Sequence, residues 1–352
     1  MAKFVIFSDL HLHPFPQFSS INNEGLNTRL LEIADVLSSV LDAAVASKCD
    51  AVLFAGDFFH TRMIAAETLD LASRTLRNYD IPIVMIPGNH DQSVKLGEYH
   101  SSRVLGSENI TILDSYDGYE VEIAGKRIIG TPYGSTINKD SKADIMLLHL
   151  GIKGARMGAD FIDCRSEHDA NALLGLAGIV FCGHYHNPAL YHKDFEYSPE
   201  GETCNTFEEY NTLIIPGAPI HHNFGDCGSR RGYWVLDYDA GFINFYPNKY
   251  KEFVKIESSK ATADMLKNRY VCLLKDSELD PSLLKVNRNI LIRDVVNKVD
   301  ERVDMRDMTD YRELLKEYIK TKKVTDEKVY DYGVMLMDMA KTYNGFQTNK
   351  NK

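Results

Sequence analysis

Residues 86–92 read IPGNHDQ and directly continue the apolar run 81–86, which has the composition of a buried β-strand. An amide, an imidazole and a carboxylate end this strand in succession, as Asn89, His90 and Asp91. The Pro-Gly pair before them predicts a tight turn. Neighbouring side chains of an extended strand point to opposite faces, whereas a turn lets Asn89 and His90 reach one site. The stretch therefore predicts that the strand ends at a functional site.

Four further predicted strands end in the same way. They are residues 4–7, followed by Asp9 and His11; 51–55, followed by Asp57 and His60; 145–148, followed by His149; and 179–182, followed by His184 and His186. Apolar residues at helical spacing over 26–44 and 65–79 separate the strands 4–7, 51–55 and 81–86. This β-α-β-α-β order predicts a parallel or mixed sheet. Ligands collect at the carboxyl ends of strands in such sheets. We therefore expect all five clusters to share one rim.

The side chains on this rim have the chemistry of metal ligands. The expected set consists of Asp9, His11, Asp57, Asn89, His149, His184 and His186. Oxygen and nitrogen ligands without thiolate suit Mn²⁺, Fe²⁺ or Zn²⁺ and do not suit a structural cysteine site. Seven side chains exceed the needs of one ion, whereas one bridging aspartate divides them into two four-ligand sets with room for water or substrate. The pattern predicts two adjacent divalent cations.

Composition and charge restrict the class of protein. The 352 residues are 44% hydrophobic and 26% charged, as in a soluble globular protein, and no apolar run is long enough to span a bilayer. The start lacks the features of a signal peptide, so we expect a cytoplasmic protein without membrane contact. Six scattered cysteines without a CxxC pair suit reduced thiols. An alternative zinc site would combine Cys204, Cys227, His221 and His222.

The second half of the chain is organised differently. Strand-rich sequence follows residue 109, and the polar, acidic segment 191–211 is predicted to be a surface insertion. Beyond residue 248 the composition shifts toward Lys, Glu and Asp, with two candidate strands in a small α/β unit. Helical patterns cover 311–320 and 327–343.

The five clusters also carry a resemblance to a known family. In chain order, DLH, GDFFH, GNHD, an isolated histidine and GHYH resemble the calcineurin-like metallophosphoesterase superfamily. The resemblance implies an α/β fold of α+β sandwich type, with four layers in which helices flank two mixed sheets. It further implies that one metal is bound by Asp9, His11 and His186, that the other is bound by Asn89, His149 and His184, and that Asp57 bridges both.

The resemblance also implies catalytic roles. Two bound cations would lower the pKa of a water molecule and neutralise charge on the phosphate. His90 is not a ligand in this pattern, and it would stabilise the phosphate oxygens or protonate the leaving group. We expect Asp91 to orient the His90 imidazole. His60 would contact the phosphate, as in the nuclease branch of the family, or it is a structural residue at the entry to a helix.

A further stretch narrows the resemblance. Residues 214–226, IIPGAPIHHNFGD, and the strand after them are similar to SbcD-type recombination nucleases, which are partners of an SMC-like coiled-coil ATPase. This similarity implies a nuclease domain over 1–250, a DNA-binding capping domain over 251–300, and ATPase-binding helices with a tail over 301–352. Asp226 replaces the usual glutamate, and the family's glycine after the first motif is missing. The size suits a compact, phage-type member in a bacterial or phage-infected cell.

Three functional hypotheses follow. The first is an exonuclease and endonuclease subunit that uses Mn²⁺, or alternatively Mg²⁺, Fe²⁺ or Zn²⁺, to cut DNA at double-strand ends and hairpins in recombination and repair. It would act as a homodimer within a heterotetramer with its ATPase. Because the net charge is −10, the metals, the ATPase and the side chains of Lys153, Arg156 and Arg165 would have to supply the positive surface. The alternatives are a metallophosphoesterase for small nucleotides or phosphoproteins, and a non-catalytic DNA-end-binding scaffold.

Overall fold

The structure of the chain is a computed structural model. It describes residues 1–92, 99–137, 143–158, 161–193, 195–197, 203–278, 280–294, 315–316, 319 and 328–335. The chain divides into two compact units, Met1–Arg293 and Asp294–Lys352. In the second unit residues 328–335 are helical, and most of the two helices predicted over 311–320 and 327–343 lies outside the described residues.

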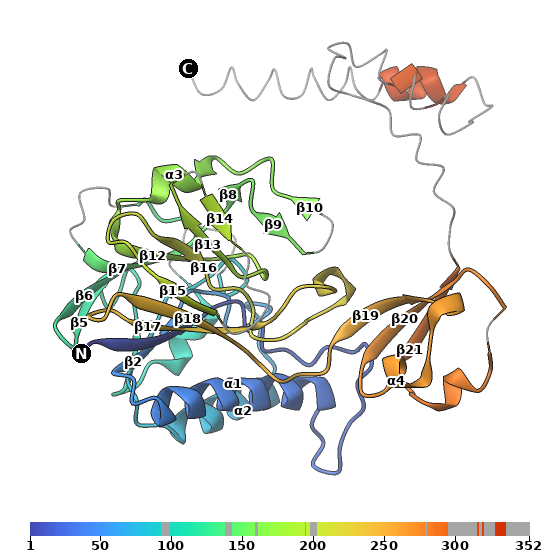
Figure 1. The fold of residues 1–352 in the computed structure, drawn as a ribbon, viewed down its shortest axis with the longest axis horizontal. Coiled ribbons are helices and arrows are strands. Elements are labelled where there is room, and N and C mark those ends of the chain that lie inside the picture. Colours follow the sequence, from blue (N-terminus) through green and yellow to red (C-terminus); the bar gives the residue numbers. More distant parts are fainter. Residues whose placement is uncertain are drawn as a thin grey trace. The chain divides into compact units, whose positions relative to one another are not determined.

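A seven-stranded sheet and two helices form one half of the first unit (Figure 1). The strands, in spatial order, are β15 (Thr203–Thr206), β18 (Phe242–Pro247), β17 (Gly232–Asp237), β1 (Lys3–Phe7), β2 (Ala51–Phe54), β3 (Ile83–Met85) and β4 (Ile110–Ile112). The four strands β1 to β4 run parallel, and α1 (Thr28–Ala46) and α2 (Ala66–Arg77) connect the first three of them. The predicted β-α-β-α-β order is therefore confirmed.

A second seven-stranded sheet packs against the first. Its strands, in spatial order, are β14 (Phe195–Tyr197), β13 (Ala189–His192), β16 (Leu213–Ile215), β12 (Ala177–Gly183), β7 (Ala143–His149), β6 (Lys126–Thr131) and β5 (Glu120–Ile123). The four strands from β16 to β6 are parallel, and the outer pairs are antiparallel. Both sheets are mixed, as the predicted fold class requires.

Each sheet is buried on both faces, which explains the continuous apolar runs in its central strands. On β1, Phe4 and Ile6 point into the core between the two sheets, whereas Val5 and Phe7 pack against α1 and α2. This alternation follows from the two-residue period of a strand. The outer face of the second sheet is covered by a third apolar cluster that includes Leu173 of the short helix α3 (Ala170–Leu173).

Short elements make up the rest of this outer layer. They are β8 (Ile152–Lys153), β9 (Arg156–Met157), β10 (Phe161–Ile162), β11 (His168–Asp169) and the 3₁₀ turns η1 (Ser101–Leu105) and η2 (Phe224–Asp226). β9 and β10 form an antiparallel hairpin. The long helices α1 and α2 therefore cover the outer face of the first sheet. Within the described residues, the short helix α3 covers part of the outer face of the second sheet.

The described parts of the segment 191–211 include two strands, so the prediction of a surface insertion between strands is incomplete. After β13 the chain forms β14 at the edge of the second sheet and then β15 at the edge of the first, paired with β18. The segment therefore extends both sheets, a role that its polar composition conceals because edge strands tolerate polar residues.

A three-stranded sheet follows β18 of the first sheet in the chain. It consists of β19 (Phe253–Glu257), β20 (Tyr270–Lys275) and β21 (Ile290–Asp294), accompanied by α4 (Ala263–Leu266), η3 (Ser258–Lys260) and η4 (Leu283–Lys285). Phe253 and Tyr270 of this sheet pack with Phe224 of η2. Among the described residues, no helix has the length and hydrophobicity that crossing a bilayer requires.

Candidate metal centre

The seven expected ligands lie together where the parallel strands end. Asp9, Asp57 and Asn89 follow β1, β2 and β3 of the first sheet, while His149 ends β7 and His184 follows β12 of the second. The two sheets approach closely here, because a Cβ atom on Gly183 would lie 2.0 Å from the Ala55 carbonyl oxygen. The glycine before His184 thus brings ligands of both sheets to one site.

Four of these residues have a left-handed backbone. The φ angles are 54° for Asp9, 47° for His11, 60° for Asp57 and 96° for His184. Side chains other than glycine rarely adopt such angles, and strain of this kind concentrates at functional sites. The Asp9 N–H donates to the Gly56 carbonyl at 2.9 Å and thereby holds the first motif against the second.

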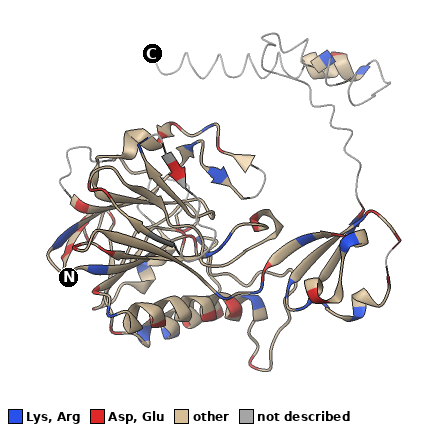
Figure 2. Cartoon of the chain, in the orientation of Figure 1, with Lys and Arg blue, Asp and Glu red and all other residues tan. Residues whose placement is uncertain are grey.

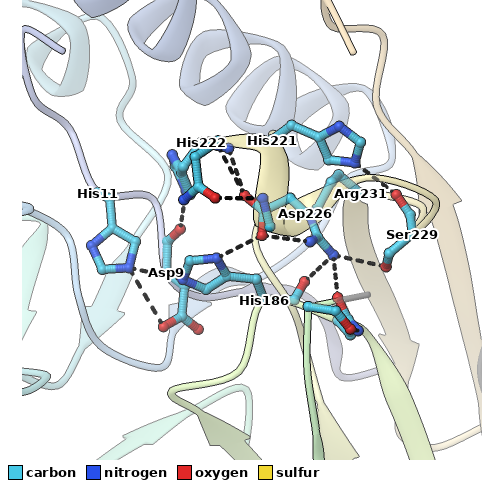
Figure 3. Close-up of polar contacts among 12 residues, drawn as sticks. Asp9, His11, His186, His221, His222, Asp226, Ser229 and Arg231 are labelled. Atoms are coloured by element: carbon cyan, nitrogen blue, oxygen red, sulfur yellow. Dashed lines mark hydrogen bonds and ion pairs between the residues drawn. The ribbon is translucent and has the colours of Figure 1, made fainter. Parts of the chain in front are cut away.

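One group of ligands consists of Asp9, His11 and His186 (Figure 3). The Nε2 atoms of the two histidines are 3.2 Å apart, and the Asp9 Oδ1 atom is 4.0 Å from His11 Nε2. The Ser8 hydroxyl donates to Asp9 Oδ2 at 2.5 Å. Ligand atoms of three side chains therefore converge on one position.

The other group consists of Asn89, His149 and His184. The Asn89 Oδ1 atom is 3.0 Å from His149 Nε2 and 2.8 Å from His184 Nδ1. His149 Nδ1 donates to the Ala55 carbonyl at 2.8 Å, so its Nε2 is the nitrogen left for a ligand bond.

Asp57 lies between the two groups. Its Oδ2 atom is 3.4 Å from His149 Nε2 and 3.7 Å from His11 Nε2. A Cβ atom on Gly88 would come within 2.1 Å of Asp57 Oδ1, so the glycine of the third motif makes room for this carboxylate. The position suits the bridging role expected for Asp57.

The electrostatics of the site fit bound cations. Asp9 is fully buried, and burial raises its pKa to about 6. Burial and the surrounding histidines lower the pKa of His11 well below its ordinary value, and burial lowers that of His184 to about 4, so these imidazoles are neutral near pH 7. His149 differs, because Asp57 outweighs burial and raises its pKa to about 9. Buried carboxylates attract positive charge, which divalent cations would supply.

His90 and His60 lie beside the ligands. The rings of His60 and His90 stack with centroids 5.1 Å apart, and each ring also lies against His11. His90 Nδ1 donates to the carbonyl oxygen of His60 at 2.8 Å. Burial lowers the pKa of His60 to about 4. Because nitrogen atoms of His11, His60 and His90 lie within 4.8 Å of one another, both predicted catalytic histidines border the centre.

The structure corrects the role expected for Asp91. Its buried carboxylate accepts the backbone N–H groups of Gly88, Phe58 and Phe59 at 3.0, 3.2 and 2.9 Å. The group that holds the His90 ring is the His60 carbonyl. Asp91 therefore joins the loops after β2 and β3 and acts on the site through the backbone.

A buried network behind His186 was not predicted (Figure 3). His186 Nδ1 lies 3.1 Å from Asp226 Oδ1, and the fully buried Arg231 donates to the same oxygen at 2.9 Å. His222 Nε2 donates to the Asp9 carbonyl at 3.0 Å. Burial opposes protonation of His186, but Asp226 outweighs it and raises the pKa. The motif at 214–226 was the available signal for Asp226, whereas nothing in the sequence singled out Arg231.

The alternative zinc site is not supported. Both ring nitrogens of His221 have other partners, since Nε2 donates to the Ser229 carbonyl at 2.8 Å and Nδ1 accepts the Phe253 N–H at 3.2 Å. Burial raises the pKa of Cys227 to about 11, which opposes the thiolate form that zinc requires. The side chain of Cys204 lies outside the described residues.

Comparison with known proteins identifies relatives of this chain. A model of the calcineurin-like phosphoesterase family matches residues 2–199, more than half of the chain. The DNA double-strand break repair protein Mre11 of Saccharolobus solfataricus is 26% identical over 44% of this chain and 42% of that protein. One of the subunits of the nuclease SbcCD of Staphylococcus epidermidis is 22% identical over 53% of this chain and 55% of that protein. The chain thus spans about half the length of the curated relatives that it matches.

A solved structure is also similar. The crystal structure of a metallophosphoesterase from Sphaerobacter thermophilus aligns with 71% of this chain and 89% of that chain, at 13% identity and a TM-score of 0.35.

Proposed function

Because the chain belongs to the calcineurin-like phosphoesterase family, and so is a metal-dependent hydrolase of phosphate esters, we propose that its substrate is DNA. It would act as a Mn²⁺-dependent exonuclease and endonuclease at double-strand ends and hairpins. The observation that carries the proposal is the position of Asp57 between two ligand groups, with the His90 N–H hydrogen-bonded to its Oδ1 atom at 2.8 Å. In this arrangement the His90 ring would serve as a proton donor or acceptor beside a site for two cations.

The residues have distinct tasks in this mechanism. Two divalent cations, when bound, supply positive charge toward a phosphate and lower the pKa of an attacking water. Asp9, His11 and His186 would hold one cation, Asn89, His149 and His184 the other, and Asp57 both. The buried network of Asp226 and Arg231 fixes the ring of His186, as outer partners of metal-bound histidines do.

His90 would act as the general acid or base. Its Nδ1–H is committed to the His60 carbonyl, so Nε2 is the ring nitrogen available to substrate. In the protonated ring, Nε2 can donate a hydrogen bond to a phosphate oxygen or a proton to the departing alkoxide. His60, which stacks on this ring, would hold it in place and border the phosphate.

DNA as the substrate is supported by two observations. The relatives named above are a DNA double-strand break repair protein and part of a nuclease. Lys153, Arg156 and Arg165 are exposed on the segment between β7 and β12, and Figure 2 shows basic residues on the β9–β10 hairpin and the β19–β20–β21 sheet. These side chains would attract phosphate despite the acidic balance of the whole chain.

We extend the proposal to the domains and partners. Residues 1–250 would be the nuclease domain, and the unit over 251–300, which contains the three-stranded sheet, would cap the DNA. Residues 301–352 would bind an SMC-like ATPase, in a heterotetramer built on a homodimer of this chain. Steep loss of DNA affinity with salt for the complex, and a shallow loss for this chain alone, would support a basic ATPase surface.

The decisive experiment measures cleavage of end-labelled duplex DNA with Mn²⁺. Wild type is compared with His90→Ala and with His168→Ala, a matched histidine variant outside the candidate metal centre. We expect His90→Ala to lose about 10²-fold or more of the rate, as for a general acid or base, while Mn²⁺ binding by calorimetry and the activity of His168→Ala are retained. Unchanged cutting by His90→Ala would remove His90 from the mechanism.

The same assay separates the alternative substrates. Hydrolysis of free nucleotides or phosphopeptides without cleavage of DNA would replace the nuclease proposal by a small-substrate phosphoesterase. DNA binding without any hydrolysis would indicate a scaffold.

A further inference from the structure

We propose that the β9–β10 hairpin carries a nucleobase-binding subsite, in which Phe161 stacks on the base next to the scissile phosphodiester. The inference rests on the proposed function and adds a substrate-positioning residue to it. The hairpin joins β9 to β10 on the chain segment between the ligands His149 and His184.

The hairpin presents large apolar side chains to solvent. Phe161 is 71% exposed, Ile162 60% and Met157 48%. Exposed apolar residues that stand singly need no explanation, but Met157 and Phe161 lie directly opposite each other on the paired strands and share one face. Ile162, the next residue of β10, points to the other face. Met157 and Phe161 thus form an apolar patch, and patches mark binding sites.

This patch continues into a cavity that reaches the candidate metal centre. The cavity has a volume of about 300 Å³, and its lining includes Met157, Phe161, His184, His186, Asp226 and Lys255. Two of these residues are expected metal ligands, so a group in the cavity lies next to the reacting phosphate. The volume is at the lower end of the range for ligand pockets and suits one nucleoside.

Tyr185 and Asn187, which alternate with the expected ligands His184 and His186, hold the hairpin in place through hydrogen bonds. Between His184 and His186, the Tyr185 hydroxyl donates to Asp163 Oδ2 at 2.7 Å and accepts the Ile152 N–H at 2.6 Å. Asp163 in turn closes the base of the hairpin, since its N–H donates to the Ala155 carbonyl at 2.9 Å.

A second attachment lies nearer the end of the hairpin. The Asn187 side-chain amide, which follows His186, donates to the Gly158 carbonyl at 2.8 Å. Gly158 also packs on η2, because a Cβ atom there would lie 2.4 Å from the Gly225 carbonyl oxygen. The apolar patch is therefore positioned by the same four residues, 184–187, that supply two expected ligands.

The chemistry of the lining favours a nucleotide. An aromatic ring offers a stacking face for any base, and Phe161 with the thioether of Met157 provides such a face. Lys255 of β19 adds positive charge to the wall, which suits a phosphate attached to the stacked nucleoside. Stacking does not read sequence, so this subsite would position the strand without base preference.

The test combines a protein change with a substrate change. The substrates are end-labelled duplexes, either complete or with one abasic nucleotide directly on one or the other side of the scissile bond. The proteins are wild type, Phe161→Ala, Phe161→Tyr and Phe242→Ala, which removes a phenylalanine exposed on β18. Thermal unfolding and Mn²⁺ calorimetry check that each variant is folded and retains its cations.

For wild type we expect the abasic nucleotide to lower kcat/KM about 5- to 30-fold on one side of the bond, within the range that loss of one base-stacking contact produces. Phe161→Ala should cut the complete duplex and this abasic duplex at the same reduced rate. Phe161→Tyr and Phe242→Ala should keep the abasic penalty, which is the ratio of kcat/KM between the complete and the abasic duplex. An undiminished abasic penalty in Phe161→Ala overturns the proposal, and so does an abasic substrate that wild type cuts as fast as the complete one.

Failure of the nuclease proposal is recognised separately. If wild type hydrolyses bis(p-nitrophenyl) phosphate but no DNA, the comparison is made between thymidine 5′-(p-nitrophenyl phosphate) and methyl p-nitrophenyl phosphate. A preference for the thymidine ester that Phe161→Ala abolishes supports the subsite, and a preference that is absent or unaffected by the variant overturns it.

Discussion

The backbone N–H of His90 donates a 2.8 Å hydrogen bond to Oδ1 of Asp57, while Oδ2 of the same carboxylate faces the ring nitrogens of His149 and His11. One carboxylate thus touches both ligand groups and the loop that carries the proposed acid. Its buried position raises the pKa, but the neighbouring His149 and His90 outweigh burial and lower it, so Asp57 is charged at neutral pH.

Replacing Asp57 by Asn should remove the shared ligand. An amide has one oxygen where the carboxylate has two, so it cannot serve both ligand groups and also accept the His90 N–H. We expect fewer than two Mn²⁺ ions per chain by calorimetry, and a loss of phosphodiester hydrolysis beyond the roughly 10- to 100-fold that outer-shell changes cause. Asp70→Asn, at a carboxylate on α2 that is 63% exposed, should change neither quantity. Two bound ions in the Asp57→Asn variant would argue against a bridging role.

Asp226 should act as a positioning residue for His186. Asp226→Asn weakens the acceptor for His186 Nδ1, so we expect Mn²⁺ affinity to fall about 10- to 100-fold. Asp226→Glu keeps the carboxylate and should restore most of this affinity. Mn²⁺ titration at constant pH measures the effect, and thermal unfolding tests whether the loss of the charge beside the buried Arg231 unfolds the protein instead. Equal affinities in the folded Asn variant and wild type would contradict the role.

Arg29 should stabilise the junction between α1 and the three-stranded sheet. Its buried guanidinium lies over the rings of Phe253 and Tyr270, at 5.0 and 4.6 Å from their centroids, and donates to the His222 carbonyl at 3.2 Å. Arg29→Met leaves this carbonyl without its donor, so we expect the free energy of unfolding to fall by about 1–3 kcal/mol in urea. Arg29→Lys should recover part of the loss, because lysine keeps the charge without the planar stack.

The pH dependence of stability should report on His221. Burial, assisted by the charge of Arg231, lowers the pKa of His221 to about 4, whereas an unfolded chain takes up this proton near pH 6.5. Between these values the unfolded state binds more protons than the folded state. The stability contributed by neutral His221 is therefore complete above about pH 6.5 and declines as pH falls toward 4, by at most about 1.4 kcal/mol per unit.

His221→Asn isolates this contribution from those of the other buried histidines. The Asn side-chain oxygen can accept the Phe253 N–H without titrating, as Nδ1 of neutral His221 does. Urea unfolding at about pH 7.5 and about pH 5 should show a smaller acid loss for the variant than for wild type. Equal losses would show that His221 is as easily protonated in the folded chain as in the unfolded one.

The parallel sheet and most of the candidate metal centre can be predicted from the sequence, because hydrophobic periodicity and the residues at strand ends are local features of the chain. The apolar runs at β1, β2 and β3 and the helical spacing between them predict a parallel sheet, and the carboxyl ends of parallel strands meet at one edge. The residue types that follow those strands predict a metal centre. Motif order and spacing then assign Asp9, His11 and Asn89 to it without knowledge of any distance.

The tertiary structure alone decided what depends on contacts between distant segments. Pairing of β17 beside β1 and packing of the two sheets set Asp226 and Arg231 behind His186, and turned the Asp91 carboxylate toward three backbone N–H groups. It also brought Phe161 of an exposed hairpin beside the expected metal ligands His184 and His186. Periodicity cannot specify such contacts, because they arise from side-chain packing and hydrogen bonding between strands far apart in the chain.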